Sequence, residues 1–222
     1  MPRVVTGLAP ATGPVGPARL AIRQPGQLGS LEWEAAPAPE PGAEDVVVRV
    51  RAAGLNFRDL MWAQGLLPEE ALMDGFAGPT LGMEMAGIVE SAPAGSGFAP
   101  GDRVFGFAPA AFATQARTRP QAIAPMPAGL DFAAAATVPV AFLTAVYALE
   151  TCANIQPGET VLVHGGAGAL GLAALQVALA AGRASPPPPA ARPSAPSCAR
   201  RGPNWCWIPR PRLRRPASRR LA

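Results

Sequence analysis

The 222-residue sequence contains no lysine, a single histidine and a single tyrosine, so few side chains remain for acid–base chemistry or metal binding. Its three cysteines, Cys152, Cys198 and Cys206, lack the spacing of a disulfide framework or a metal knuckle, which indicates free thiols in a reducing cytosol. No apolar run reaches the roughly 18 to 20 residues that a membrane span needs. The N-terminus also lacks the apolar segment of a signal peptide. We therefore expect a cytoplasmic protein without a membrane segment.

Charge is distributed unevenly along the chain. Residues 1–183 contain 10 arginines and all 15 acidic residues, a net charge of −5, whereas residues 184–222 contain nine arginines and no acid. The sequence pI of about 9.7 is therefore a property of the tail. A folded domain that recognises nucleic acid would itself be basic, so we expect no specific nucleic-acid partner.

The first 139 residues read as a β domain. Residues 1–17 are rich in proline and glycine and predict a loose lead-in, and residues 18–139 alternate short apolar segments with turns. This pattern is typical of a barrel-like β domain. The expected strands are 20–23, 31–34, 46–51, 83–90, 103–107 and 111–116, and the expected helix is 57–64.

Residues 140–183 change to an α/β pattern. We expect a helix over 142–153, a buried strand over 160–164, a glycine turn and a second apolar helix up to residue 182. The turn contains the spacing Gly166-x-Gly168-x-x-Gly171 between strand and helix, the position at which such a motif binds a dinucleotide. The first glycine allows a tight turn, and the helix N-terminus offers free amides to a pyrophosphate. A plain tight turn is the alternative.

Residues 184–222 show neither the strand period of 2 residues nor the helical period of 3.6 residues. Ten of these 39 residues are proline, which fixes φ and has no amide donor, so we expect a disordered tail. Our hypothesis is that the tail is translated in a shifted frame, because codons for residues 204–208, read one base out of register, must encode Leu-Val-Leu-Asp, a strand-like segment. The rival interpretation is a genuine Arg/Pro-rich arm that binds nucleic acid or acidic partners through its charge.

Five ordered motifs together resemble the medium-chain dehydrogenase/reductase family, and within it the enoyl reductase domains of modular polyketide synthases. They are AAGLNFRDLMWAQGLLPEEA, GPTLGMEMAGIVE, PGDRVFGF, ATVPVAFLTAVYAL and QPGETVLVHGGAGALGLAALQVA, which lie between residues 52 and 178. The resemblance implies a mixed β and α/β fold: a GroES-like β-barrel domain (18–139) and then the first strand-helix unit of a Rossmann NADPH-binding domain (140–183). The tail (184–222) would lie outside that fold.

The resemblance also implies the site residues. Asn56 matches a position beside the nicotinamide and the substrate carbonyl, and is the catalytic and cofactor-binding candidate. Thr144 matches a position that contacts cofactor. The cofactor loop corresponds to Gly166, Ala167, Gly168, Ala169, Leu170 and Gly171. Ala169 stands where relatives often have glycine, which adds a Cβ near the cofactor.

Zinc is not expected. Zinc-dependent relatives carry Gly-His-Glu where this chain has Gly82-Met83-Glu84, and a thioether cannot replace an imidazole ligand. We expect structural roles for Glu84, for the Arg58–Asp59 pair and for His164, which would support the glycine turn. Leu67 occupies the position at which many relatives have a tyrosine associated with protonation, so the proton donor is unassigned.

Three functions remain open. The first is an NADPH-dependent, zinc-independent enoyl reductase that reduces an α,β-unsaturated acyl thioester on an acyl carrier protein, expected to be inactive as this truncated chain. The second is a quinone-reductase-like NADPH oxidoreductase. The third is a non-catalytic β domain with a basic binding tail.

Overall fold

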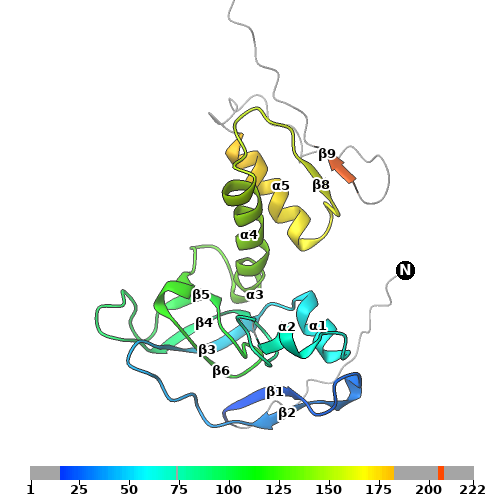
Figure 1. Cartoon of the computed structure of the whole chain (residues 1–222). Helices are drawn as coiled ribbons and strands as arrows, with labels where there is room; N and C mark the ends of the chain where they lie inside the picture. Colours follow the sequence, from blue (N-terminus) through cyan, green and yellow to red (C-terminus); the bar gives the residue numbers. More distant parts are fainter. Residues whose placement is uncertain (1–15, 74, 183–204, 208–222) are drawn as a thin grey trace, which may run out of the picture. The chain divides into compact units, whose positions relative to one another are not determined.

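The computed structural model describes residues 16–73, 75–182 and 205–207, which form two compact units, Met1–Val140 and Ala141–Ala222 (Figure 1). Each unit is considered by itself. The expected loose segment 1–17 and the tail 184–222 lie almost wholly outside the described residues.

The first unit is built on an antiparallel five-stranded sheet with the strand order β6-β3-β4-β5-β7. A second pair, β1 (Ala18–Ile22) and β2 (Leu31–Ala35), is also antiparallel. Two hydrogen bonds join β1 to the segment before β6: Leu20 N to Phe112 O at 2.7 Å and Thr114 N to Ala18 O at 2.8 Å. The expected β domain is confirmed. The strands of the larger sheet are β3 (Val46–Ala53), β4 (Glu84–Ser91), β5 (Arg103–Phe107), β6 (Gln115–Thr118) and β7 (Ile123–Pro125).

Alternation along β3 explains where the core of this unit lies. Val46 and Val48 point to the same side of the sheet, because side chains in a strand alternate with a period of two. Both are fully buried, and they pack with Met85 and Val104 from the neighbouring strands. The opposite side is covered by α3 (Phe132–Ala136), whose Ala136 packs against Ala86 of β4. The sheet is therefore buried on both faces at its centre.

Short helices connect the strands. Besides α3 there are α1 (Phe57–Ala63), α2 (Glu69–Met73) and two 3-10 turns, Leu28–Ser30 and Pro120–Ala122. Helix α3 begins after Asp131, whose Oδ1 accepts a hydrogen bond from Ala134 N at 2.7 Å and so caps the helix. The Arg103 guanidinium lies 4.9 Å from the centre of the Phe132 ring.

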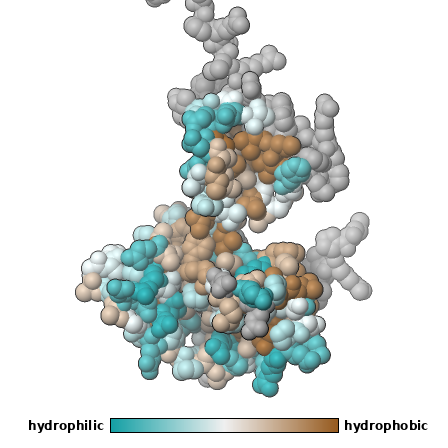
Figure 2. All heavy atoms as spheres, in the orientation of Figure 1, coloured by the Kyte–Doolittle hydropathy of each residue, from teal (hydrophilic) through white to brown (hydrophobic). Residues whose placement is uncertain are grey.

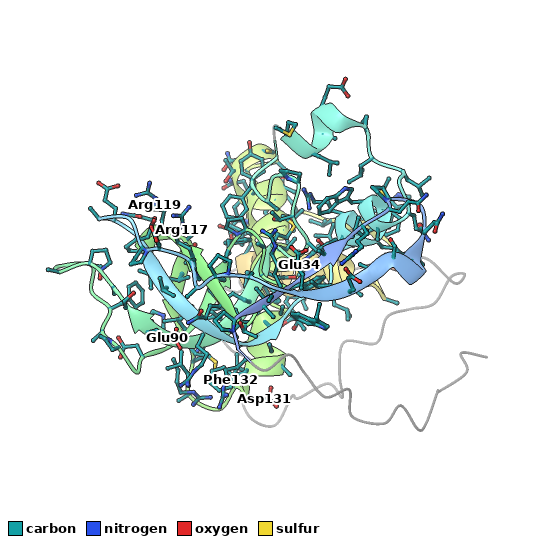
Figure 3. The ribbon with its side chains drawn as sticks, turned by 90° about the horizontal axis from the view of Figure 1, so that it is seen from below. Glu34, Glu90, Arg117, Arg119, Asp131 and Phe132 are labelled. Atoms are coloured by element: carbon teal, nitrogen blue, oxygen red, sulfur yellow. The ribbon has the colours of Figure 1, made fainter. Side chains whose placement is uncertain are left out.

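The edge strand β6 carries a surface ion-pair network. Arg117 and Arg119 extend from the same part of the sheet (Figure 3), and each lies 3.5 Å from an oxygen of Asp45. Arg119 also pairs with Glu44. Both arginines are more than half exposed, so these pairs add little to stability but place charge along an edge that could otherwise pair with another strand.

The second unit contains two packed helical segments. Helix α4 (Pro139–Val146) spans the division between the units and continues as a π-helix, η3 (Tyr147–Cys152), in place of the uniform α-helix expected over 142–153. Ala145 of α4 packs against Ala173 and Val177 of α5 (Ala169–Ala181).

Strand β8 (Leu162–His164) leads into the glycine turn but is not buried on both faces as expected. Val163 is buried, whereas Leu162 is 54% exposed. The described residues of the tail, β9 (Trp205–Trp207), pair with β8 in the antiparallel direction rather than as the parallel neighbour of a βαβ unit. Figure 2 shows hydrophobic side chains on the surface of this unit, where Leu143, Tyr147, Leu162, Leu170 and Leu172 are exposed.

Candidate functional site

Asn56 lies at the point where β3 and its following turn lead into α1. Its backbone is extended, with φ −109° and ψ 153°, and it is the N-cap of α1. Asn56 and Asp59 form a capping box, in which the Asn56 side chain faces the Asp59 amide and Asp59 Oδ2 accepts from Asn56 N at 3.0 Å. This capping box, between residues three apart in the sequence, holds the Asn56 main chain at the start of α1.

Asp59 connects this helix start to the segment before β4. Its side chain is 2% exposed, and its Oδ1 accepts a hydrogen bond from Gly82 N at 2.9 Å. The Arg58 guanidinium lies 3.9 Å from the same oxygen and donates to the Gly78 and Thr80 carbonyls. The structural role expected for Arg58 and Asp59 agrees with these contacts.

Glu84 contacts the Asn56 side chain, which the sequence did not indicate. Glu84 is 4% exposed, and its Oε1 accepts a hydrogen bond from Asn56 Nδ2 at 2.8 Å. Its Oε2 accepts from Val140 N at 2.8 Å. A partner 28 residues away follows from the pairing of β3 with β4, and no local motif signals it.

Burial raises the pKa of the Glu84 carboxyl above its ordinary value of 4.5. The hydrogen bonds from the Val140 amide and the Asn56 side chain lower this pKa, and the charge of Asp59 raises it further. Desolvation is the largest of these effects, so the folded state holds the Glu84 proton more tightly than the unfolded chain does.

The raised pKa of Glu84 predicts a pH-dependent stability. A carboxyl with a higher pKa in the folded state stabilises the fold most below its unfolded pKa, and this contribution is lost as pH rises through the folded pKa. Urea unfolding at successive pH values above 4.5 should therefore show the wild-type chain losing stability relative to Glu84→Gln. Parallel pH profiles of the two chains would contradict the prediction.

The chain neighbours of Asn56 are exposed apolar residues. The amide is half-buried, while Leu55 and Phe57, its chain neighbours, are 77% and 75% exposed, and Leu60 of α1 is 40% exposed. An isolated polar group between exposed apolar side chains is typical of a binding surface for a mostly apolar ligand with one polar atom. Asn56 Nδ2 also donates to Gly54 O at 3.5 Å, and this long bond is the one that such a ligand could replace.

The glycine turn opens α5 without any side chain at its N-cap. Gly168 is the N-cap, and Gly171 is packed so closely that a Cβ there would lie 2.3 Å from Gly165 O. The left-handed residue of the turn is Gly165, with φ 66°, one residue before the motif begins. The close packing of Gly171 brings the start of α5 against the backbone of Gly165 and Gly166.

The first amides of α5 are available to an anion. Among the described residues, the amides of Ala169, Leu170 and Gly171 donate no hydrogen bond to a partner outside the helix, and Gly168 provides no cap. The N-terminus of a 13-residue helix carries partial positive charge at these amides. The turn therefore fits the pyrophosphate of a dinucleotide.

The expected site residues divide between the two units. Asn56 belongs to Met1–Val140, whereas Thr144 and the turn from Gly166 to Gly171 belong to Ala141–Ala222. Thr144 lies exposed on α4, next to Ala145, which packs against α5. Ala167, Ala169 and Leu170 are exposed at the turn. Sequence reasoning gave Glu84 a structural role without its contact to Asn56, and it did not single out Gly165, for which a second glycine directly before the motif was the available signal.

No metal site is evident in the described part of the chain. Within residues 16–73, 75–182 and 205–207, no group of three His, Cys, Asp or Glu side chains could hold a metal ion. None of the helices in those ranges has the length and apolar character required to cross a bilayer.

Comparison with known proteins places this fold. Residues 42–146 match the family model of the alcohol dehydrogenase GroES-like domain. The chain is 46% identical over 164 residues to the pikromycin polyketide synthase component PikAII of Streptomyces venezuelae, a match covering 70% of this chain and 4% of that protein.

Solved structures agree with this match. The CurK enoyl reductase has a TM-score of 0.71 and 35% identity over 76% of this chain and 52% of its own. The quinone oxidoreductase of Coxiella burnetii has a TM-score of 0.65 and 29% identity, covering 75% of this chain and 54% of its own. Mycobacterial Rv1454c, solved with NADPH, has a TM-score of 0.62 and 29% identity, covering 75% and 50%.

The chain thus spans about half of the solved reductases that it matches and a small part of the synthase. The range matched by the family model, residues 42–146, includes the five-stranded sheet of the first unit. This chain matches the alcohol dehydrogenase GroES-like domain over residues 42–146 and resembles, within the medium-chain dehydrogenase/reductase family, the enoyl reductases of polyketide synthases.

Proposed function

We propose that this chain derives from an NADPH-dependent enoyl reductase that reduces the α,β-double bond of an acyl thioester. The observation that carries the proposal is the glycine turn into α5, with three amides that donate to no described partner outside the helix, in a chain similar to solved enoyl reductases. NADPH would supply the hydride to the β-carbon. An acyl carrier protein would present the thioester, since the proteins similar to this chain include polyketide synthases.

The residues of the second unit would hold the cofactor. Amides at the start of α5, Ala169 to Gly171, would donate to its pyrophosphate, and the absence of a side chain at Gly168 leaves room for that approach. The Thr144 hydroxyl, exposed on α4, would add a polar contact. The mycobacterial relative solved with NADPH supports the choice of cofactor.

The first unit would bind the substrate. Asn56 would exchange its 3.5 Å hydrogen bond to Gly54 O for one to the thioester carbonyl, where negative charge develops as hydride arrives at the β-carbon. The exposed apolar side chains of Leu55 and Phe57 would contact the acyl chain. Zinc would have no part, because Met83 stands where zinc-dependent relatives carry a histidine ligand.

A quinone-reductase activity is the second candidate. It is favoured by the similarity to the Coxiella quinone oxidoreductase, which has nearly the same TM-score as the enoyl reductases. Both reactions use hydride transfer and a donor to an oxygen, so the acceptor substrate separates them.

The 222-residue chain by itself is expected to be inactive. In the described residues β8 pairs only with the antiparallel β9, and a strand-helix unit of this size cannot bury enough surface to hold a cofactor rigidly. NADPH consumption by the purified chain on a crotonyl thioester would contradict this expectation.

A chimera provides the positive test. Residues 1–182 would be joined to the part of the CurK enoyl reductase that follows its equivalent of α5. We expect NADPH oxidation with a crotonyl thioester, and Asn56→Ala in the chimera should lower kcat/KM about 100-fold, the usual effect of losing one oxyanion donor.

The substrate panel separates the candidates. Turnover of quinones but not of the crotonyl thioester would favour the quinone reductase. A folded chimera that oxidises NADPH with neither substrate would rule out both.

A further inference from the structure

The side chain of Glu84 is a buried carboxylate without a cation. It is 4% exposed, and among the described residues it forms no salt bridge. Its two oxygens instead accept one hydrogen bond each, from Asn56 Nδ2 and from Val140 N, both at 2.8 Å. A buried carboxylate held only by neutral donors is costly, which suggests that its contacts serve more than stability.

The backbone makes space for this carboxylate at one position. A Cβ on Gly54 would lie 2.3 Å from Glu84 Oε1, 2.5 Å from its Cδ and 2.6 Å from Ala136 O. Gly54 N also donates to Glu84 O at 3.1 Å. Glu84 therefore lies against bare backbone two residues before Asn56, and it has little freedom to turn away.

Asn56 is also held through its main chain. Asp59 accepts hydrogen bonds from the backbone N–H of Asn56 and from that of Gly82, and Gly82 lies two residues before Glu84. The Asn56 main chain and side chain are thus tied to the same short segment, once through Asp59 and once through Glu84. Asn56 is fixed more firmly than a half-buried loop side chain would otherwise be.

The chemistry of the two partners sets the orientation of the Asn56 amide. An ionised carboxylate only accepts hydrogen bonds, so the amide nitrogen and not its oxygen must face Glu84. The amide oxygen faces the Asp59 amide in the capping box. The second Nδ2 hydrogen makes only a long hydrogen bond, 3.5 Å, to Gly54 O, which the carbonyl of a ligand would replace.

We infer that Glu84 is a positioning residue, whose carboxylate orients the Asn56 amide to donate its second hydrogen to the carbonyl of a bound ligand. This inference rests on the proposed function for the ligand, but the orientation itself does not require one. Glu84 would act through Asn56 and would not touch the substrate.

Side-chain NMR of the full 222-residue chain tests the orientation. The chain has three asparagines, Asn56, Asn154 and Asn204, so selective ¹⁵N-asparagine labelling yields three amide pairs, and Asn56→Ser identifies its own. The variants are Glu84→Gln and, as the matched control, Glu90→Gln on the same strand, which removes a carboxylate near Arg49 and Gln115 (Figure 3).

In the wild type, the Asn56 amide shift should follow the titration of the Glu84 carboxyl carbon. In Glu84→Gln this pH dependence should vanish, and hydrogen exchange of the Asn56 amide should accelerate about tenfold, as expected for losing a hydrogen bond to a charged group. Glu90→Gln should change neither.

An unchanged Asn56 amide in a folded Glu84→Gln chain would overturn the inference. If that variant does not fold, Glu84→Asp retains the charge but is one methylene too short to reach both donors, and an unchanged Asn56 amide there would overturn it equally. The measurement uses no cofactor or substrate, so a failure of the proposed reductase activity would leave its outcome unaffected.

Discussion

Replacing Asp59 with alanine is expected to lower the free energy of unfolding by about 3 kcal/mol, in the range typical of breaking a buried charged network. The substitution leaves the amides of Asn56 and Gly82 without their acceptor, and both amides belong to the segments that hold the candidate site. It also leaves Arg58 without its nearest carboxylate. Urea unfolding followed by circular dichroism measures the loss.

Asp131→Ala is the matched control for this prediction. Asp131 caps α3 through one hydrogen bond to Ala134 N and is exposed, so its removal should cost about 1 kcal/mol, the usual effect of losing a helix cap. Equal losses in the two variants would show that Asp59 acts as an ordinary cap and that its link to Gly82 contributes nothing.

Replacing Gly54 with alanine is expected to have a similarly large effect, about 3 kcal/mol, at the upper end of the usual cost of overpacking. The new Cβ would lie within 2.6 Å of Ala136 O and nearer still to the Glu84 carboxylate. Neither can move easily, since Ala136 belongs to α3 and both Glu84 oxygens are hydrogen-bonded.

Gly29→Ala provides the comparison, because no atom lies within 4 Å of a Cβ at Gly29. This variant should be as stable as the wild type or more stable by up to about 1 kcal/mol, because alanine lowers the conformational entropy of the unfolded chain. Both variants would be measured by urea unfolding in the full chain. A Gly54→Ala chain as stable as Gly29→Ala would contradict the close approach of Glu84.

Much of the sheet could be predicted because its information is local. The β-branched run at 46–51 and the turn before 103 mark β3 and β5 directly, and the structure confirms both strands. The last predicted strand, 111–116, is displaced to Gln115–Thr118. The reason is that Ala111 and Phe112 donate to Gly82 O and Leu81 O, outside the ladder, which the sequence does not indicate.

The helices show where local information ends. Helix α3 consists of one phenylalanine and four alanines, so it has no apolar period to detect, and only Asp131 marks its start. The segment Tyr147–Cys152 carries an ordinary helical pattern, and no residue type there signals a π-helix.

In the candidate site, too, local features could be predicted and contacts between distant residues could not. Asn56 and the glycine turn were found from motifs, because the chemistry of each depends on residues close in sequence. The contact of Asn56 with Glu84 depends on the register of β3 against β4, where Ala53 lies opposite Met85. A pattern of single residues carries no information on that register.

The close approach at Gly54 also constrains how the sequence can evolve. Every missense change of a glycine codon introduces at least a Cβ, and at this position the Cβ would meet Glu84 and the Ala136 carbonyl. A lineage that keeps Glu84 therefore loses stability at any single substitution of Gly54. Prior loss of the carboxylate would lower that cost but would remove only one of the two obstacles.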